Sequence, residues 1–463
     1  MNLGHFSPHR HIPVCRSGPL SARHLSPKKL GSICNSTKRT SRSDSQTLVD
    51  STMKGFTLLS LLTGALWASS KASAAIPSGP AKTYAACQRK TCDPLDGCPP
   101  NTLFVSKSSA RANFTTIQAA IASLPNNTTP YTILIAPGDY TEQLNVTRQG
   151  PLTLLGMTDR PSNGSLYANV NLNTTAANRN EVQVWWNSAN HNAVFPDNVY
   201  TSVLTVGPNL NATLTGMGPT GFAVPEDTLF GCSDFRAYNI DFRNDEFPFS
   251  NGPAHAVGVS RANAGFYSCG LYSYQDTLYV GKLGNAYFYD NVIAGQTDFL
   301  YGFGTAYIEK STLSLRNCGG GITAWKGTNT TFENKYGVYI SDSQAIAANA
   351  SIAQVIKGAC PLGRPWNAQH RSIFMESYFD ASIKPQGYIP WGSTDPRTNN
   401  VTFMAVYNDR GPGWTPETMA ASNVTIVLND EGVEPYRNPV NVFQTEDGTP
   451  GFVSWIDESV LRS

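Results

Sequence analysis

The chain has 463 residues, a formal net charge of +1 at pH 7 and only 14% charged residues. Its 39 glycines, 20 tyrosines and 21 phenylalanines favour a β-rich secreted protein. This composition argues against a helical cytosolic protein.

The N-terminal region has the features of an export signal. Residues 1–52 are rich in Ser, His and Pro and carry eight basic residues without apolar periodicity, so we expect a disordered extension. Met53-Lys54, the apolar run 56–67 and Ala72-Ser73-Ala74 match the three parts of a secretory signal over residues 53–74. We therefore expect translation from Met53, with an organellar transit peptide as the alternative for residues 1–52. The apolar run is too short to span a membrane.

Cleavage after Ala74 removes ten of the 34 basic and two of the 33 acidic residues, leaving a charge of about −7. That charge argues against nucleic acid as a partner. Asn-x-Ser/Thr sequons recur after the signal, at Asn113, Asn126, Asn127, Asn145, Asn163, Asn173, Asn211, Asn329, Asn349, Asn400 and Asn423. With the signal, they predict a secreted, extracellular glycoprotein, and we expect a monomer.

Seven cysteines follow the signal. Three of them, Cys87, Cys92 and Cys98, cluster in a leader over residues 75–100, and the others are Cys232, Cys269, Cys318 and Cys360. No histidine lies near the cluster, so a disulfide is favoured there over a metal site. The odd number leaves at least one thiol.

A short helix and many short strands are predicted after the leader. Residues 114–124 have apolar residues at helical spacing, with Thr115 or Thr116 as a possible N-cap. The predicted strands cover residues 131–136, 152–155, 201–206, 235–242, 256–259, 265–267, 286–289, 299–308, 338–340, 373–375 and 401–406. No helix-length segment separates these strands, which argues against a βαβ fold.

Three strand segments resemble copies of one repeat. Their aromatic residues Tyr238, Phe266 and Phe288 are 28 and 22 residues apart. A period of 20–25 residues predicts a stacked solenoid, with a β-sandwich as the alternative.

His255, Asp276 and Asp298 follow at intervals of 21 and 22 residues. In a parallel β-helix such residues stack on one face, about 4.8 Å apart. Two carboxylates at neighbouring rungs can serve as nucleophile and proton donor on one carbonyl group. A turn residue and a ladder residue are the alternative interpretation of the pair.

Five blocks, in order, resemble the pectin methylesterase (pectinesterase) family. They are Gly138-Asp139-Tyr140-Thr141-Glu142, His255-Ala256-Val257-Gly258-Val259, Tyr274-Gln275-Asp276-Thr277-Leu278-Tyr279, Thr297-Asp298-Phe299-Leu300-Tyr301-Gly302 and Leu362-Gly363-Arg364-Pro365-Trp366. Segments 320–324, 387–391 and 408–413 agree as well. The similarity covers about residues 100–415, within a domain that we place at residues 101–463 with a C-terminal tail.

The resemblance implies an all-β, right-handed, single-stranded parallel β-helix that removes methyl esters from galacturonate units of pectin without a metal or other cofactor. It makes Asp298 the nucleophile and Asp276 the acid/base. Gln275 becomes an oxyanion-hole donor, although strand alternation would point it away unless the strand bulges. Arg364 would pair with Asp298, and Trp366 would line the sugar groove.

The implied roles agree with the expected pKa values of the two carboxyl groups. Arg364 beside Asp298 favours the ionised nucleophile. Burial and the charge of Asp298 would raise the pKa of Asp276 and keep this acid protonated.

The chain departs from the family pattern at three positions. His255 replaces a glutamine that acts as a second oxyanion donor, so we hypothesise that activity depends on its tautomer or charge; a packed structural histidine is the alternative. Lys326, after Trp325, could bind a galacturonate carboxylate or be solvated. Tyr301 replaces a phenylalanine and, with Tyr279, is a candidate for substrate contact. The departures suggest a divergent branch.

Two other functions remain open. One is a β-helical pectin lyase or glycoside hydrolase, although no Asp-rich calcium cluster is present in the sequence. The other is a catalytically weakened pectin-binding protein, which His255 favours and the Asp276, Asp298 and Arg364 set opposes. Methyl-esterified homogalacturonan is the expected partner in each case, and no membrane partner is expected.

Overall fold

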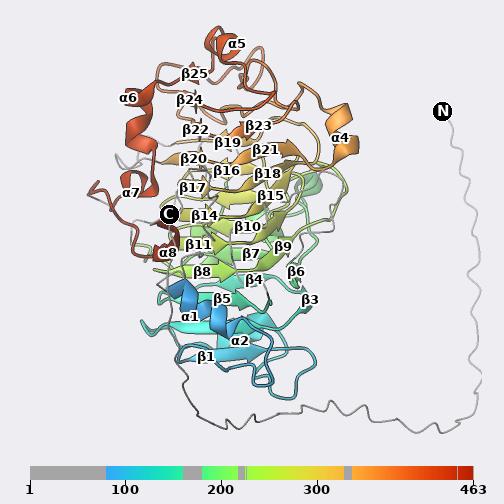
Figure 1. Ribbon diagram of the computed structural model, residues 1–463, viewed down its shortest axis with the longest axis vertical. Helices are drawn as coiled ribbons and strands as arrows, with labels where there is room; N and C mark the ends of the chain where they lie inside the picture. The colour runs from blue at the N-terminus through green and yellow to red at the C-terminus, as the bar shows by residue number, and fades with distance from the viewer. Residues whose placement is uncertain are drawn as a thin grey trace, which may run out of the picture. The chain divides into compact units, whose positions relative to one another are not determined.

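A computed structural model describes residues 80–159, 180–216, 225, 227–327, 336–445 and 447–461, all within one compact unit, Ala74–Ser463. The expected basic extension and export signal lie outside the described residues. Three sheets form the unit, and every pairing between their strands is parallel. Figure 1 shows the strands stacked in chain order.

The first sheet contains β1 (Thr102–Val105), β2 (Tyr131–Ile135), β5 (Leu152–Gly156), β8 (Phe235–Tyr238), β11 (Asn263–Tyr267), β14 (Asn285–Tyr289), β17 (Thr305–Glu309), β20 (Gly337–Ser341), β22 (Arg371–Met375), β24 (Phe403–Tyr407) and β25 (Ile426–Val427). The second contains β3 (Gly138–Thr141), β6 (Val182–Trp185), β9 (Ile240–Arg243), β12 (Gly270–Tyr272), β15 (Val292–Gly295), β18 (Thr312–Leu315), β21 (Gln344–Ala347) and β23 (Tyr378–Phe379). The third contains β4 (Leu144–Val146), β7 (Leu204–Val206), β10 (Val257–Val259), β13 (Leu278–Val280), β16 (Leu300–Gly302) and β19 (Thr323–Trp325).

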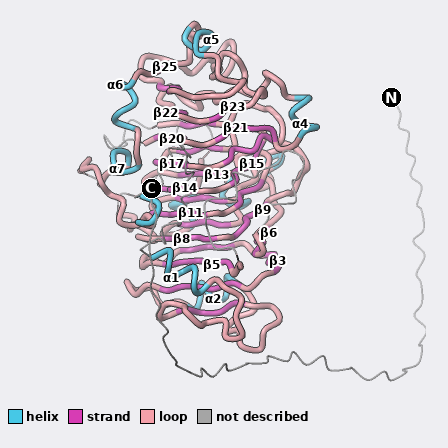
Figure 2. The backbone as a smooth tube through the Cα atoms, in the orientation of Figure 1, coloured by secondary structure: helices cyan, strands magenta, loops and turns pink. Residues whose placement is uncertain are grey.

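Short helices lie at the edges of this strand stack (Figure 2). They are α1 (Pro80–Cys87), α2 (Ile117–Ser123), α3 (Leu210–Thr213), α4 (Ala350–Val355), α5 (Pro416–Ala420), α6 (Asp430–Val433), α7 (Pro439–Val442) and α8 (Glu458–Leu461), with 3-10 turns at His191–Ala193, Asn198–Thr201 and Glu434–Tyr436. Within the described ranges, no helix is long and apolar enough to cross a bilayer.

From β2 to β19, each coil of the chain contributes one strand to each sheet. After β11 the chain forms β12 in the second sheet and β13 in the third, and β14 then pairs with β11. This path confirms the expected right-handed, single-stranded parallel β-helix and excludes the β-sandwich. The side chains inside the coils form one apolar core.

The predicted strands are present, but two of them are each divided in two. Residues 235–242 contain β8 and β9, which are separated by Asn239 in a left-handed conformation (φ 52°). Residues 299–308 likewise contain β16 and β17. Turn residues that leave the extended conformation allow the chain to pass from one sheet to the next.

The predicted alignment of three aromatic residues was wrong at one position. Phe266 pairs with Phe288, as expected, and their rings stack with centroids 4.9 Å apart. Tyr238, however, pairs with Tyr267 instead of Phe266. A one-residue slip moves a side chain to the opposite face of a strand. Tyr238 therefore packs outside the coil, whereas Phe266 packs inside it.

The predicted helix is α2, but neither candidate threonine caps it. Thr116 occupies the N-cap position without a side-chain hydrogen bond. The carboxylate of Glu142 instead accepts hydrogen bonds from the backbone N–H groups of Ile117 and Gln118, at 3.0 and 2.8 Å. A carboxylate at this end also interacts favourably with the helix dipole.

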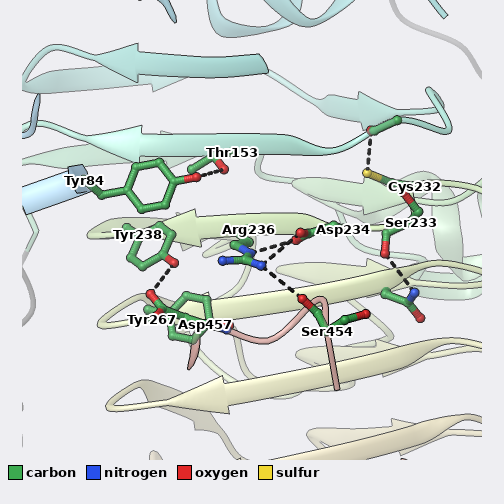
Figure 3. Close-up of polar contacts among 12 residues, drawn as sticks. Tyr84, Thr153, Cys232, Ser233, Asp234, Arg236, Tyr238, Tyr267, Ser454 and Asp457 are labelled. Carbon is green, nitrogen blue, oxygen red and sulfur yellow. Dashed lines mark hydrogen bonds and ion pairs between the residues drawn. The ribbon is translucent and has the colours of Figure 1, made fainter. Parts of the chain in front are cut away.

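The segment before α8 packs on the outer face of the first sheet, as Figure 3 shows. The Tyr238 hydroxyl donates to Asp457 Oδ2 at 2.7 Å, and the Asp457 N–H donates to the Tyr267 hydroxyl oxygen at 2.8 Å. Nearby, Arg236 forms two hydrogen bonds with Asp234, at 2.7 and 2.9 Å. The two hydrogen bonds of Asp457 join residues about 200 positions apart in the sequence.

Two disulfides are present among the residues that the structure describes. Cys87–Cys98 confirms the disulfide expected in the leader. Cys318–Cys360 joins the turn before β19 to the segment that leads to Arg364. Cys232 and Cys269 are buried thiols, and the odd number of cysteines after the signal requires at least one.

Candidate active site

The third sheet aligns the residues that the 21- and 22-residue intervals selected. Strands β10, β13 and β16 pair so that Val257, Leu278 and Leu300 are in register. His255, Asp276 and Asp298 each lie two residues earlier, so they occupy equivalent positions on three neighbouring rungs. The expected stack is therefore confirmed.

Both aspartates interrupt the extended backbone. Asp276 and Asp298 have left-handed φ values of 59° and 48°. The Asp276 N–H donates to the Thr297 carbonyl at 3.1 Å, which ties the two turns together. A non-glycine residue in this conformation is uncommon and is often found at functional sites. Both carboxyl groups belong to largely buried residues, which are 8% and 7% exposed.

Arg364 pairs with Asp298, as the resemblance implied. Its Nε and Nη2 donate to the two carboxylate oxygens at 3.1 and 2.7 Å. The guanidinium carbon also lies 4.0 Å from the centre of the Trp391 ring. Arg397 lies 4.2 Å from the same ring and donates to the Trp366 carbonyl at 3.0 Å. Stacking and bidentate pairing fix the position of the Arg364 guanidinium.

The surroundings of the two aspartates favour different protonation states for them. Burial raises the pKa of Asp276 well above its usual value, and the charge of Asp298 adds to the rise, against Arg364 and Lys326. Burial also raises the pKa of Asp298, but the hydrogen bonds and charge of Arg364 oppose this rise. Asp298, which contacts the cation directly, therefore loses its proton first.

Gln275 has one end of its amide held in place. Its Oε1 accepts hydrogen bonds from Ser250 Oγ at 2.8 Å and from the Gly252 N–H at 3.2 Å. Because the oxygen is engaged, the Nε2 group is the end available to donate. The left-handed turn at Asp276 interrupts the strand alternation that would have pointed Gln275 away.

The His255 ring is fully buried, and both of its nitrogens are engaged. Nδ1 lies 3.0 Å from Ser202 Oγ, and Nε2 is bonded to the Tyr301 hydroxyl. Burial lowers the pKa of His255 to about 3, so the ring is neutral near neutral pH. The ring therefore has no N–H group left to donate to a substrate oxyanion.

Four further predicted site residues, three aromatic residues and a lysine, form a layer beside these rungs. Trp366 is partly exposed, and its ring lies 5.2 Å from that of the buried Tyr301, which in turn lies 5.0 Å from the Tyr279 ring. The Lys326 ammonium lies 3.4 Å from the centre of the Trp366 ring. Lys326 is fully buried, which excludes the alternative of a solvated lysine, and burial lowers its pKa to about 7. Of these four residues, only Trp366 offers a surface to a substrate.

Sequence reasoning missed several supporting residues. Trp391 packs against the guanidinium of Arg364, Arg397 packs against Trp391, and Ser202 binds His255. Trp391 ends one of the flanking segments that agree with the family, so a signal for it was available. Gly320 is another such residue, because a Cβ atom there would lie 2.2 Å from the Arg364 guanidinium.

Comparisons with known proteins point to the same family as the sequence blocks. The sequence model of the pectinesterase family matches residues 181–436. A pectinesterase of Petunia integrifolia is 30% identical over 223 residues, which cover 46% of this chain and 58% of that protein. The chain thus spans little more than half of that relative.

Solved structures show the same fold. The pectin methylesterase of Erwinia chrysanthemi is 25% identical, with a TM-score of 0.54, over 75% of this chain and 98% of that chain. The Aspergillus niger pectin methylesterase gives 22% and a TM-score of 0.57, over 78% and 98%. Because the family match covers more than half of the sequence, the chain belongs to the pectinesterase family.

Proposed function

We propose that the chain hydrolyses methyl esters of galacturonate units in pectin, with Asp298 as nucleophile and Asp276 as acid/base. One observation carries the proposal: Arg364 binds both carboxylate oxygens of Asp298, while Asp276 occupies the equivalent position one rung away. The pair thus combines a stabilised anion with a carboxyl group that burial keeps protonated.

In the first step, an Asp298 oxygen attacks the C6 ester carbonyl carbon and forms a tetrahedral oxyanion. The Gln275 amide N–H stabilises this oxyanion. The bond from C6 to the methoxy oxygen then breaks, and Asp276 transfers its proton to that oxygen. Methanol leaves, and an anhydride joins C6 to Asp298.

In the second step, the Asp276 carboxylate removes a proton from water. The water oxygen attacks C6, and the bond between C6 and the Asp298 oxygen breaks. The galacturonate carboxylic acid is released and ionises in solution, Asp298 is again a carboxylate, and Asp276 is again protonated. The cycle requires no group beyond this chain, the ester and water.

The substrate proposed is methyl-esterified homogalacturonan outside the cell, in the cell wall. Trp366 supports this choice because a partly exposed aromatic ring beside the aspartates can pack against a sugar face. The Lys326 ammonium lies 3.4 Å from the centre of the Trp366 ring and places a cation within the same layer. Export through the signal at Met53 would bring the enzyme to this polymer.

Methanol release from highly methylated pectin tests the proposal on protein expressed from Met53 in a secreting host. The wild type should release methanol, whereas Asp298→Asn should lose at least about 1000-fold in kcat, because the nucleophile is removed. Asp290→Asn is the matched control, since Asp290 is another buried aspartate with a left-handed φ, bonded to Ser268 away from the pair. It should keep wild-type activity.

The same assay separates the alternative functions. A lyase would generate unsaturated ends that absorb ultraviolet light, and a glycoside hydrolase would generate reducing ends. A pectin-binding protein would retain the polymer and release nothing. Any of these results without methanol would refute the esterase proposal.

A further inference from the structure

The ammonium group of Lys326 lies against the ring of Trp366. Its nitrogen is 3.4 Å from the centre of the Trp366 ring and 4.0 Å from the centre of the Phe303 ring. Lys326 is fully buried and Phe303 is 2% exposed, whereas Trp366 is partly exposed. The cation therefore contacts a buried part of the indole and leaves the exposed part open to a sugar.

Backbone hydrogen bonds place the lysine and the tryptophan side by side. The Lys326 N–H donates to the Gly302 carbonyl at 3.0 Å, at the end of β16. The Trp366 N–H donates to the Trp325 carbonyl at 3.2 Å, and the Trp366 carbonyl accepts from Arg397 at 3.0 Å. Both main chains are thus fixed, and the two side chains start from neighbouring positions.

The orientation of the Trp366 ring depends on side-chain contacts, because backbone bonds leave its χ angles free. The Tyr301 ring packs against it with centroids 5.2 Å apart and planes tilted by 38°. The Lys326 ammonium is the charged contact of the ring. Tryptophan is the best aromatic partner for a cation, and the attraction is strongest where the cation is removed from water, as it is here.

We propose that Lys326 is a positioning residue for substrate binding: its ammonium group holds the Trp366 ring in the orientation that packs against a galacturonate ring. This inference rests on the proposed esterase function. A fully buried ammonium does not reach a galacturonate carboxylate, so Lys326 acts on the sugar through the indole.

The charge that holds the ring depends on pH. Burial lowers the pKa of Lys326 to about 7, and the charge of Lys282 adds to the fall, against Asp276 and Asp197. The Lys282 ammonium lies 5.4 Å from the centre of the Phe303 ring, which Lys326 also contacts. Below about pH 7 Lys326 is a cation, and above it the neutral amine loses its electrostatic attraction to the indole.

The test is the effect of paired substitutions on KM for methanol release at pH 6. Lys326→Met removes the charge but keeps an unbranched side chain, and it should raise KM about 5- to 30-fold without lowering kcat. Trp366→Ala should raise KM at least as much. The double variant Lys326→Met/Trp366→Ala should have the KM of Trp366→Ala, because no ring remains for the lysine to hold.

Lys282→Met is the matched control, since it removes a lysine that packs against the Phe303 ring instead, and it should keep the wild-type KM. An unchanged KM in folded Lys326→Met would overturn the proposal. A further rise in KM when Lys326→Met is added to Trp366→Ala would also overturn it, because the lysine would then act without the ring. A loss of kcat at unchanged KM would assign Lys326 to the reaction step and equally contradict the proposal.

A comparison of the wild type with Trp366→Ala remains decisive if Lys326→Met does not fold. The ratio of their KM values measures what the ring contributes to binding. This ratio should decrease as pH rises from 5 to 9, through the Lys326 pKa of about 7, and a constant ratio would refute the proposal.

Equilibrium binding of methyl-esterified oligogalacturonate repeats these comparisons without turnover, on proteins that also carry Asp298→Asn. The dissociation constants should change as the KM values do. Failure of the esterase function is seen separately, as absence of methanol from the wild type, whereas equal affinities of the proteins with and without Lys326→Met would refute the role of Lys326.

Discussion

Gly320→Ala should disable the nucleophile without touching either aspartate. The added Cβ would lie 2.2 Å from Cζ and Nε and 2.3 Å from Nη2 of Arg364. The guanidinium cannot remain there, since carbon atoms in contact need about 3.5 Å. Gly320 does not have a positive φ, so alanine adds no backbone strain of its own.

The size of the effect follows from the distances. Relief of the clash requires a movement of about 1 Å. The bonds from Arg364 to Asp298 are 3.1 and 2.7 Å, so such a movement takes at least the first of them beyond hydrogen-bonding distance. A displacement of this size at a catalytic group lowers kcat/KM by ~100-fold. The pKa of Asp298 should also rise, because burial is then less opposed, and the low-pH limb of activity should move to higher pH.

Methanol release measured from pH 4 to 9 checks both expectations. Gly392→Ala is the matched control, because a Cβ there meets only the Asp395 carbonyl oxygen, at 3.7 Å, on the loop next to Trp391. It should leave activity and melting temperature unchanged. If folded Gly320→Ala keeps the kcat/KM and the low-pH limb of the wild type, the position of Arg364 does not control the ionisation of Asp298.

Three further predictions concern other parts of the molecule. Replacing Cys318 and Cys360 together by serine should lower the free energy of unfolding by about 4 kcal/mol, because the disulfide no longer restricts a 42-residue loop in the unfolded chain. Urea denaturation under oxidising conditions measures this change, and an unchanged midpoint would contradict the prediction. Burial raises the pKa of Asp290 to about 6, so wild-type stability should fall as pH rises from about 4 through 6. Asp290→Asn should therefore be more stable than the wild type by up to about 3 kcal/mol at pH 8 but not at pH 3. Equal melting curves of the two proteins at pH 8 would refute the raised pKa of Asp290. Gln275→Met should lower kcat by about 100- to 1000-fold with little change in KM; a loss confined to KM would assign Gln275 to substrate binding instead of the oxyanion.

The sequence predicted the fold and the aligned pair because the coils between His255 and Asp298 have nearly constant length. When coils have a regular length, residues that are one coil length apart in the sequence occupy equivalent positions on neighbouring rungs. The register failed at Tyr238, where the longer connection between β9 and β10 gives the coil from Phe235 to Ala264 a length of 29 residues, against 22 from Asn263 to Asn285. The alignment of Tyr238 therefore depends on the path of this connection, which the local sequence pattern does not specify.

Side-chain partners were less predictable than positions. Ser202 and Tyr301 lie 53 and 46 residues from His255, and only the assembled rungs bring them to opposite sides of its ring. Glu142 caps α2 from 24 and 25 residues away, so a search for local capping residues selected Thr115 and Thr116. The burial of a charged side chain, as at Lys326, is likewise a tertiary property that residue type alone argues against.

The parallel pairing of β7, β10, β13 and β16 has a consequence for how such a chain can vary over evolutionary time. Ser202 and His255 are separated by 53 residues, whereas Asp276 and Asp298 are separated by 22, yet both pairs occupy adjacent rungs. The vertical distance between reactive groups is thus set by backbone hydrogen bonds, independently of how much chain each turn contains. Insertions can enlarge the outer loops of one turn and leave the reacting atoms at their original separation. Substrate preference and chemistry can therefore change independently on this scaffold.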